Sequence, residues 1–301
     1  MLAKQSERTS LKNASHSLTK GKCVCYNTYI KERETVRMKN KHEGRSCPDR
    51  ISETGIRAHL SADAPPIFVY EEISSTNDAA RAHALAGGGS AVFIAERQTA
   101  GRGRRGRSFS SPAGGGIYMS LLVYPSHGAG DGVLLTTGAA VAMCRAVQDA
   151  AGVLPEIKWV NDLKLGGKKL CGILTEGEID PVSGSFRYAV IGVGINVRAV
   201  PPEVADIATA LDAHAAEPVD RELLAARMIA RILESLSEDG AAQIEAYRAL
   251  CPIVGREVTV MRGGECFFAT VEHIEDDGAL RLSRDGETLC LSSGEISIRE
   301  K

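Results

Sequence analysis

The sequence predicts an α+β fold: a mixed, mostly antiparallel sheet with helices on one face, followed by a small β-barrel. Three observations predict this class. Short apolar runs follow one another over residues 65–200 with turns between them, and strands so connected pair mostly as antiparallel neighbours. Helical patterns interrupt and follow these runs. The end of the chain alternates in short hairpins.

Residues 1–64 differ in composition from the rest of the chain. They hold thirteen Lys or Arg against seven Asp or Glu, few large apolar residues and no sustained apolar period. We expect this basic extension to be largely disordered, because it cannot bury enough apolar surface. The three amphipathic helices of a winged helix-turn-helix are not found here.

The elements of a central domain over residues 65–251 can be placed in order. Ser75-Thr76-Asn77-Asp78 precedes an Ala-rich run that ends at Gly87-Gly88-Gly89, which is typical of a capped helix. The expected strands are 67–70, 91–96, 116–124, 157–160, 170–176 and 188–197, and the expected helices are 76–86, 133–150, 218–238 and 241–250.

Residues 252–301 are expected to form a separate β domain. After Cys251-Pro252, short strands are joined by Gly263-Gly264, Asp276-Asp277-Gly278 and Asp285-Gly286. About fifty residues of hairpins suit a small barrel.

Composition excludes several classes of protein. No apolar run reaches the roughly 18 residues of a membrane span, and no secretory signal is recognised. The eight cysteines form no Cys-x-x-Cys pair, so neither a zinc site nor a disulfide framework is predicted, and reduced thiols in a cytoplasm are expected. The net charge of −2 provides no general attraction to nucleic acid.

The most unusual motif is Gly101 to Arg107, which contains only glycine and arginine. Glycines let a backbone approach a ligand closely, and guanidinium groups present several N–H donors to phosphate or carboxylate. The motif lacks the Gly-Lys-Ser/Thr ending of a P-loop. A solvated turn or a nucleic-acid patch stays open for this segment taken alone.

Two later segments indicate a ligand site between strands. Asn161 and Asp162 follow an expected strand, and Lys169 stands at the entry of another. Gly172, Gly192 and Gly194 interrupt strands that are otherwise built to be buried. Because glycine weakens a strand but leaves space beside the backbone, these positions predict a slot for a ligand.

Five segments together resemble the biotin protein ligase family in order and spacing. They are Ser75-Thr76-Asn77, Gln98 with residues 101–107 (the Gly/Arg loop), 158–163, 169–174 and 192–196. The resemblance runs from about Phe68 to Arg299. The family commonly has proline where this chain has Val160, and often tryptophan where it has Phe109. The resemblance implies a class II aminoacyl-tRNA synthetase-like catalytic core over 65–251 and an SH3-like barrel over 252–301.

The resemblance also implies an activity. Members of the family use ATP, with Mg²⁺, to convert biotin to biotinyl-5'-AMP, and then transfer the biotinyl group to a lysine of a biotin carboxyl carrier protein domain of a biotin-dependent carboxylase. The single-function form is expected here, in the cytoplasm, with no specific nucleic acid and no membrane as partner. Both dimers and monomers occur in the family, so a homodimer stays open.

Site residues are implied in the same way, with Lys169 and Arg104 as catalytic residues. The implied biotin-site residues are Ser75, Thr76, Asn77, Gln98, Gly101, Arg102, Gly103, Arg104, Lys169, Gly172, Leu174 and Gly192. The implied nucleotide-site residues are Phe109, Asn161, Asp162, Ile195, Asn196 and Arg299, and Asp162 is the candidate Mg²⁺ ligand.

Two alternatives remain. A lipoate ligase-like transferase would share the fold and also modify a carrier lysine, but such relatives generally lack the Gly/Arg loop beside the 158–163 segment. A bifunctional biotin operon repressor would add a DNA-binding domain, for which residues 1–64 lack the apolar pattern.

Overall fold

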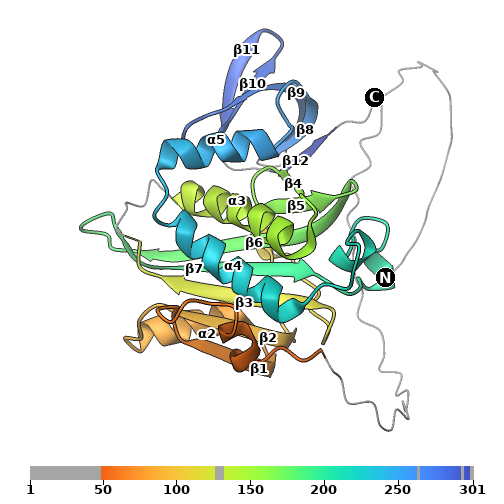
Figure 1. Cartoon of the computed structure of the whole chain (residues 1–301). Coiled ribbons are helices and arrows are strands. Elements are labelled where there is room, and N and C mark those ends of the chain that lie inside the picture. The colour runs from red at the N-terminus through yellow and green to blue at the C-terminus, as the bar shows by residue number, and fades with distance from the viewer. Residues whose placement is uncertain (1–48, 126–131, 263–264, 293–294, 299–301) are drawn as a thin grey trace, which may run out of the picture. The chain divides into compact units, whose positions relative to one another are not determined.

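A seven-stranded sheet forms the larger part of the structure, which is a computed structural model (Figure 1). It describes residues 49–125, 132–262, 265–292 and 295–298. In spatial order the strands are β1 (Ile67–Ile73), β2 (Ala91–Gln98), β3 (Gly116–Val123), β7 (Phe186–Asn196), β6 (Lys168–Ile179), β5 (Asp162–Leu165) and β4 (Glu156–Lys158). β1 and β2 are parallel and the other neighbours are antiparallel, which confirms the mixed, mostly antiparallel sheet.

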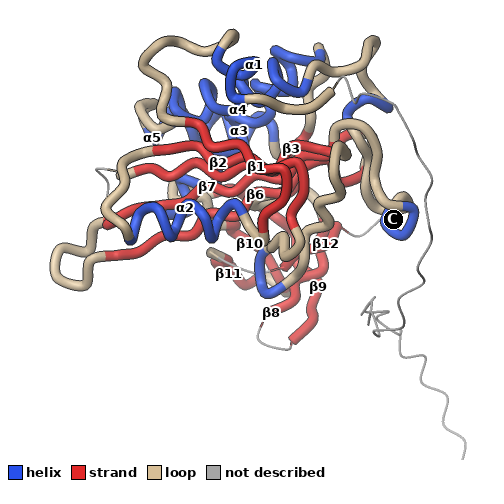
Figure 2. The backbone as a smooth tube through the Cα atoms, turned by 90° about the horizontal axis from the view of Figure 1, so that it is seen from below, coloured by secondary structure: helices blue, strands red, loops and turns tan. Residues whose placement is uncertain are grey.

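Helices cover both faces of this sheet. α3 (Gly132–Ala151) and α4 (Arg221–Ser235) lie on one face, whereas α2 (Thr76–Leu85) lies on the other (Figure 2). Alternate strand residues serve the two faces, so Ile94 joins the core under α3 and α4 while Phe93 packs with Ala80 of α2. The α+β class is confirmed. The expected placement of the helices on one face is right for α3 and α4. It is wrong for α2, which lies on the opposite face because its alanines pack against Phe93.

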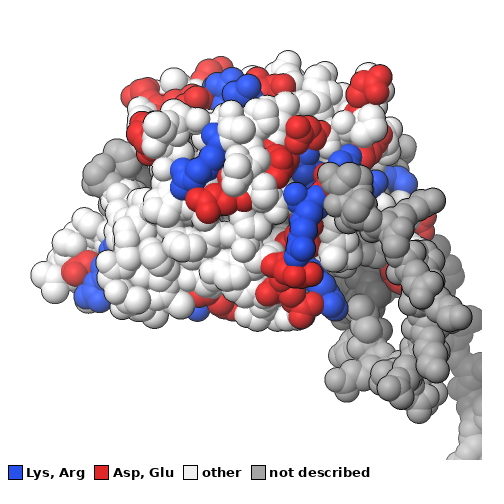
Figure 3. All heavy atoms as spheres, turned by 60° about the horizontal axis from the view of Figure 1, so that its bottom comes forward, with Lys and Arg blue, Asp and Glu red and all other residues white. Residues whose placement is uncertain are grey.

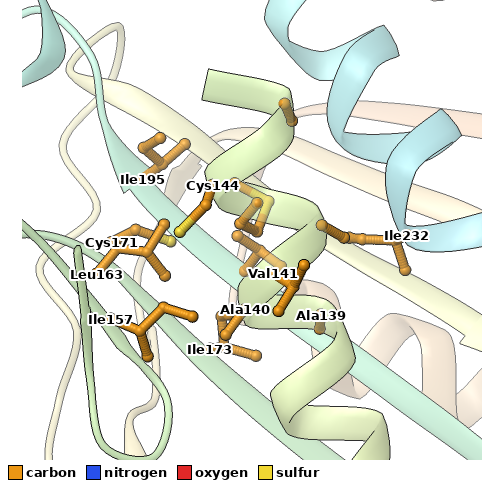
Figure 4. Packing of buried hydrophobic residues seen from close by; sticks show 14 of the residues in the cluster. Ala139, Ala140, Val141, Cys144, Ile157, Leu163, Cys171, Ile173, Ile195 and Ile232 are labelled. Atoms are coloured by element: carbon orange, nitrogen blue, oxygen red, sulfur yellow. The ribbon is translucent and has the colours of Figure 1, made fainter. Parts of the chain in front are cut away.

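Small side chains bring α3 close to the sheet. Ala139, Ala140 and Val141 are buried, and Figure 4 shows the helix lying over Ile173 and Ile195. Close packing of apolar atoms stabilises a core, so α3 holds β6 and β7 in place. The same two strands carry Gly172, Gly192 and Gly194, which open toward the opposite face of the sheet.

The expectation of disorder across residues 1–64 is wrong for residues 49–64, while residues 1–48 lie outside the described part of the chain. Ser52 caps the short helix α1 (Glu53–Arg57), and Ile51 and Ile56 are 3% and 0% exposed. Two isolated isoleucines produce no detectable period. Their burial depends on the surface that α4 presents, which the local sequence does not contain.

A buried ion pair joins that surface to the sheet. Arg221 of α4 is fully buried, and its Nη2 lies 2.7 Å from both carboxylate oxygens of Glu96 on β2. Glu96 Oε1 also accepts a hydrogen bond of 2.7 Å from the backbone N–H of Ile51. The pair therefore connects α4, β2 and the segment before α1.

The expected strand over 157–160 is shorter, and the strand after it was missed. β4 ends at Lys158, the cis peptide Trp159–Val160 lies in the turn, and Asp162 begins β5. β5 has four residues, too few for a period to be recognised. Connections in the described part of the chain contain the 3-10 turns η1 (Arg104–Gly106), η3 (Pro202–Val204) and η4 (Leu211–Ala213).

The C-terminal part is an antiparallel sheet, consistent with the expected small barrel-like domain. α5 (Gly240–Leu250) precedes it. Its spatial order is β11 (Glu287–Leu291), β10 (Leu280–Arg284), β9 (Glu265–Ile274), β8 (Glu257–Arg262) and β12 (Glu295–Ile298). Trp159 Nε1 donates to the carbonyl of Gly278 at 2.9 Å, so the turn between β9 and β10 contacts the turn between β4 and β5. Among the described helices, none combines the length and apolar character needed to cross a membrane.

Replacing Arg221 tests the buried pair. We expect Arg221→Ala to lower the free energy of unfolding by about 3–5 kcal/mol in urea titrations, because Glu96 keeps its charge without a buried partner. Arg231→Ala is the matched control on the same helix: its pairs with Asp149 and Glu234 are partly exposed, and we expect a loss below about 1 kcal/mol. Equal losses in the two variants would contradict the assignment.

Candidate active site

A cavity opens on the face of the sheet that α2 covers, between the ends of β2, β6 and β7 and the Gly/Arg loop. It brings together most of the implied site residues: Ser75, Thr76, Asn77, Gln98, Arg102, Gly103, Arg104, Phe109, Asn161, Asp162, Lys169, Gly172, Leu174 and Gly192. Segments that lie far apart in the chain therefore line one cavity.

The cavity also has lining residues that sequence reasoning did not assign: Arg105, Arg107, Ser108, Met119, Lys158, Trp159, Ile173, Val193 and Gly194. Several of them carried a signal, since Arg105 and Arg107 belong to the Gly/Arg motif. Gly194 belongs to the glycine pattern, and Lys158 and Trp159 open the 158–163 segment. Met119 and Val193 look like ordinary strand residues, and only the sheet register brings them to the cavity wall.

A glutamine caps the start of α2. Gln98 Oε1 accepts from the backbone N–H of Thr76 at 2.9 Å, and Gln98 Nε2 donates to Ser111 Oγ at 3.0 Å. Ser75 occupies the N-cap position of the expected helix but makes no side-chain cap bond. Its buried hydroxyl lines the cavity instead.

Asn77 is held at both ends of its amide. Ser120 Oγ donates to its Oδ1 at 2.6 Å, and its Nδ2 donates to Glu176 Oε2 at 2.7 Å. A Cβ at position 192 would stand 2.1 Å from Asn77 Oδ1. Gly192 is therefore required to make room for the Asn77 side chain, whereas sequence reasoning had attributed the space to a ligand.

The Gly/Arg loop is a small hairpin. Gly103 N donates to Arg107 O at 2.7 Å and Phe109 N to Gly101 O at 2.8 Å. Gly106 and Arg105 have positive φ at the tip. A Cβ on Gly101 would stand 2.5 Å from the Phe109 carbonyl, so glycine is needed there for the close approach of the two chain segments. Gly101 does not itself line the cavity.

Arg104 reaches from the tip of this loop to the turn before β5. Its Nη1 donates to Asn161 Oδ1 at 3.0 Å, while Asn161 Nδ2 donates to the carbonyl of Ile173 at 2.7 Å. Burial lowers the pKa of the Arg104 guanidinium. Because arginine titrates far above neutral pH, the group stays charged, and it presents a partly desolvated cation to the cavity.

A second cation lies on β6. Lys169 Nζ is 2.7 Å from Asp162 Oδ1, and a Cβ at position 172 would come within 3.1 Å of that ammonium group. Both backbone groups of Lys169 are hydrogen-bonded as well, since its N–H donates to Ile207 O and its carbonyl accepts from Thr209 N. The ammonium group is thus held in place beside the cavity.

Phe109 lies over β7 at the cavity. A Cβ at position 194 would approach its ring to 2.5 Å, and its ring centroid is 6.3 Å from that of Tyr118 in an edge-to-face arrangement. Gly194 therefore lets an aromatic ring lie directly against the strand, which creates a flat apolar wall.

Two implied nucleotide residues are not part of the cavity. The side chain of Ile195 is fully buried on the α3 face, next to Cys144 and Cys171 (Figure 4), so it does not line the cavity, and its implied nucleotide contact stays a prediction. The reason is strand alternation, which turns Ile195 away from the face that Gly194 presents. Asn196 Nδ2 instead donates to Thr209 O at 3.1 Å. Arg299 lies outside the described residues.

The described residues contain no group of three or more His, Cys, Asp or Glu that could hold a metal ion. Asp162 is the carboxylate that lines the cavity, and Lys169 pairs with it. Mg²⁺ commonly uses one or two carboxylates together with substrate phosphates. The donor set therefore fits a phosphate-borne Mg²⁺ with a single protein ligand.

Cys171 does not supply a nucleophile. The residue is fully buried beneath α3, and burial raises the pKa of its thiol well above the ordinary value. Because a thiolate is the reactive form, this thiol acts as a small apolar side chain.

Two family models match the parts of the chain that hold the cavity and the C-terminal sheet. Residues 70–196 match the biotin/lipoate A/B protein ligase family, and residues 253–299 match the biotin protein ligase C-terminal domain. The first match holds the cavity residues and the second holds the C-terminal sheet.

Several curated relatives are similar over long stretches. The bifunctional ligase/repressor BirA of Bacillus subtilis is 38% identical over 58% of this chain, and the match spans 55% of that relative's length. The chain thus spans little more than half of it. The biotin–acetyl-CoA-carboxylase ligase of Mycobacterium tuberculosis is 35% identical, over 76% of this chain and 87% of the relative.

Solved structures are similar in fold. A biotin protein ligase from Aquifex aeolicus in complex with biotin and ATP has a TM-score of 0.66 and 24% identity, covering 78% of this chain and 99% of that one. A biotin protein ligase from Leishmania major in complex with biotin has a TM-score of 0.52 and 26% identity, covering 76% of this chain and 99% of that one.

The role of Gly192 can be measured by stability. We expect Gly192→Ala to lower the free energy of unfolding in urea by about 1–3 kcal/mol, because the new methyl group displaces the buried amide of Asn77. Gly89→Ala is the control, since no atom lies within 4 Å of its Cβ position. Wild-type stability in Gly192→Ala would show that Asn77 is not fixed as described.

Proposed function

Since the chain belongs to the biotin protein ligase family, we propose that it activates biotin with ATP and transfers the biotinyl group to a lysine of a carrier protein domain. One observation carries the proposal: the cavity sets a cradle of amide and hydroxyl groups beside two held cations, Arg104 and Lys169. A neutral polar head group with an anionic tail is complementary to such a site.

The cradle suits the ureido head of biotin, which carries N–H donors and a carbonyl acceptor. Ser75, Thr76, Asn77 and Gln98 supply hydroxyl and amide groups there, and Gly172, Leu174 and Gly192 form the strand wall. Gln98 and Asn77 each have both ends of the amide committed to the protein. Their orientations are therefore fixed before a ligand arrives, which reduces the cost of binding.

In the first step, an oxygen of the biotin carboxylate attacks the α-phosphorus of ATP. A phosphorus–oxygen bond to the carboxylate forms, the bond to the bridging oxygen breaks, and pyrophosphate leaves with the electron pair. Two anions approach one another in this step, so the ammonium group of Lys169 and the guanidinium group of Arg104 offset their repulsion and stabilise the developing charge.

In the second step, the amine of the carrier lysine attacks the acyl carbon of biotinyl-5'-AMP. An amide bond forms, AMP leaves, and the amine loses its proton. No protein nucleophile is needed for either step. Phe109 and Asn161 line the cavity; Phe109 would offer a face for the adenine, and Asn161 would lie beside the nucleotide. The Gly/Arg loop would exclude water, which otherwise hydrolyses the mixed anhydride.

Mg²⁺ would neutralise phosphate charge and be held by Asp162 together with the phosphates themselves. We propose residues 65–251, joined by the segment from 49, as the catalytic domain and 252–301 as the small β domain. The proposed partner is a biotin carboxyl carrier domain of a biotin-dependent carboxylase, in the cytoplasm, without specific nucleic acid. Homodimer and monomer are both compatible with this proposal.

Pyrophosphate exchange tests the first step. Purified protein is expected to exchange labelled pyrophosphate into ATP when biotin is added, because adenylate formation is reversible, and to show background exchange with lipoate. The readout is radiolabelled ATP at matched biotin and lipoate concentrations. Exchange that is absent with biotin, or equal with lipoate, would end the proposal in favour of another ligase of the same fold.

Two adjacent lysines provide a matched pair of variants. We expect Lys169→Ala to reduce biotin-dependent exchange by about 10²–10³-fold, the loss that follows removal of one preorganised charge stabiliser. Lys168→Ala should stay within about twofold of wild type, since Lys168 Nζ is exposed and donates to Ala205 O away from the cavity. Retained exchange in Lys169→Ala would remove the catalytic role of that residue.

A further inference from the structure

Arg102, the first arginine of the Gly/Arg loop, contacts protein carboxylates. Its Nη2 donates to Asp78 Oδ1 at 2.6 Å and to Glu176 Oε2 at 3.4 Å. Asp78 lies in the first turn of α2 and Glu176 on β6. One guanidinium group thus connects the loop to two elements that are fixed in the core.

Glu176 is itself held in position. Its Oε1 accepts from Arg81 Nη2 at 3.2 Å, and its Oε2 accepts from Asn77 Nδ2 at 2.7 Å. Each carboxylate oxygen of Glu176 therefore has a donor from α2 in addition to the contact with Arg102. The same Oε2 is shared by Asn77, which lines the cavity, and by Arg102, which belongs to the loop.

The other contacts of the loop separate the roles of its arginines. Arg104 lies at the tip and bonds to Asn161 across the cavity. Arg102 lies in the stem, where it forms an isolated β-bridge with Ser108. Its side chain ends on Asp78 and Glu176, and these carboxylates balance its charge.

We propose that Asp78 and Glu176 form a carboxylate latch that holds Arg102 and keeps the Gly/Arg loop over the cavity. Arg102 is then a positioning residue, and Glu176 couples the closed loop to the orientation of Asn77. The loop-holding role stands on the contacts alone. Its consequence for retention of an adenylate rests on the proposed function.

The latch is of a strength suited to a loop that must open. The side chains of Arg102, Asp78 and Glu176 are 37%, 45% and 31% exposed. Ion pairs so accessible to water are weak and are screened by salt. On the face that Figure 3 draws, acidic and basic side chains lie next to one another. Short-range pairing therefore accounts for the hold on the loop.

Limited trypsin digestion reads the loop directly, because trypsin cleaves after its arginines. We expect Asp78→Asn and Glu176→Gln each to raise the rate of cleavage within residues 102–107 by about three- to tenfold, measured by mass spectrometry on unliganded protein. Glu176→Gln keeps an acceptor for Asn77, and Asp78 is exposed enough that its variant should fold normally.

Two controls accompany the digestion. Glu178→Gln changes a carboxylate on the same strand that pairs with Arg187, and its cleavage rate should equal that of wild type. Raising KCl from about 50 to 500 mM should accelerate wild-type cleavage toward the variant rate and should change the rate of Asp78→Asn less, because that variant keeps only the Glu176 pair; a reference peptide corrects for the effect of salt on trypsin itself. Unchanged cleavage in both carboxylate variants would overturn the latch.

A double-mutant cycle separates a positioning role of Arg102 from contact with a ligand. Arg102→Ala and Asp78→Asn should raise KM for biotin and the release of free adenylate to a similar extent, and the double variant should equal Arg102→Ala. Asp78→Glu, which keeps the charge, should stay within about twofold of wild type. Additive effects, or a much larger effect of Arg102→Ala alone, would show that Arg102 contacts the ligand and would overturn its positioning role.

The two proposals fail in different ways. Absence of biotin-dependent exchange in the wild type ends the proposed function, while trypsin digestion still reports whether the carboxylates hold the loop. Normal exchange together with unchanged digestion in Asp78→Asn and Glu176→Gln ends the latch and leaves the proposed function intact.

Discussion

The close approach of side chains to glycine backbone on β6 and β7 is the constraint on which the site depends. Asn77 lies against Gly192, Phe109 against Gly194 and the Lys169 ammonium against Gly172. Any larger residue at the first two positions would overlap those groups. The opposite face of the same strands is filled by α3, so the strands cannot move away to relieve the overlap.

Polar side chains around this surface fix one another. Gln98, Asn77 and Asn161 each donate from nitrogen to one protein group and accept on oxygen from another. An amide with both ends committed has one orientation, so the recognition surface is set before binding. Two cations of the cavity are likewise held by protein acceptors, Lys169 by Asp162 and Arg104 by Asn161.

The arginines of the loop divide by what surrounds them. Arg104 is partly desolvated at the cavity, whereas Arg102 is half exposed between carboxylates from two elements. Four arginines close together repel one another, and a loop of glycines gives them little support. Protein acceptors from α2, β6 and the turn before β5 supply the balancing charge and polarity. Loop, head-group cradle and strand register are therefore parts of one arrangement.

The sequence by itself determined the class of the sheet and the order of most strands along the chain, because apolar alternation is a local signal that acts through the backbone. Most of the residues that line the cavity were implied by the resemblance of short segments to a known family. Tertiary structure decided the rest. Ile56 is buried because α1 packs against α4, and Ile195 turns from the cavity because β7 has a definite register. Gly192 serves Asn77, and Arg102 meets Glu176 across 74 positions of the chain. Such contacts between distant residues leave no local pattern, so only the folded chain reveals them.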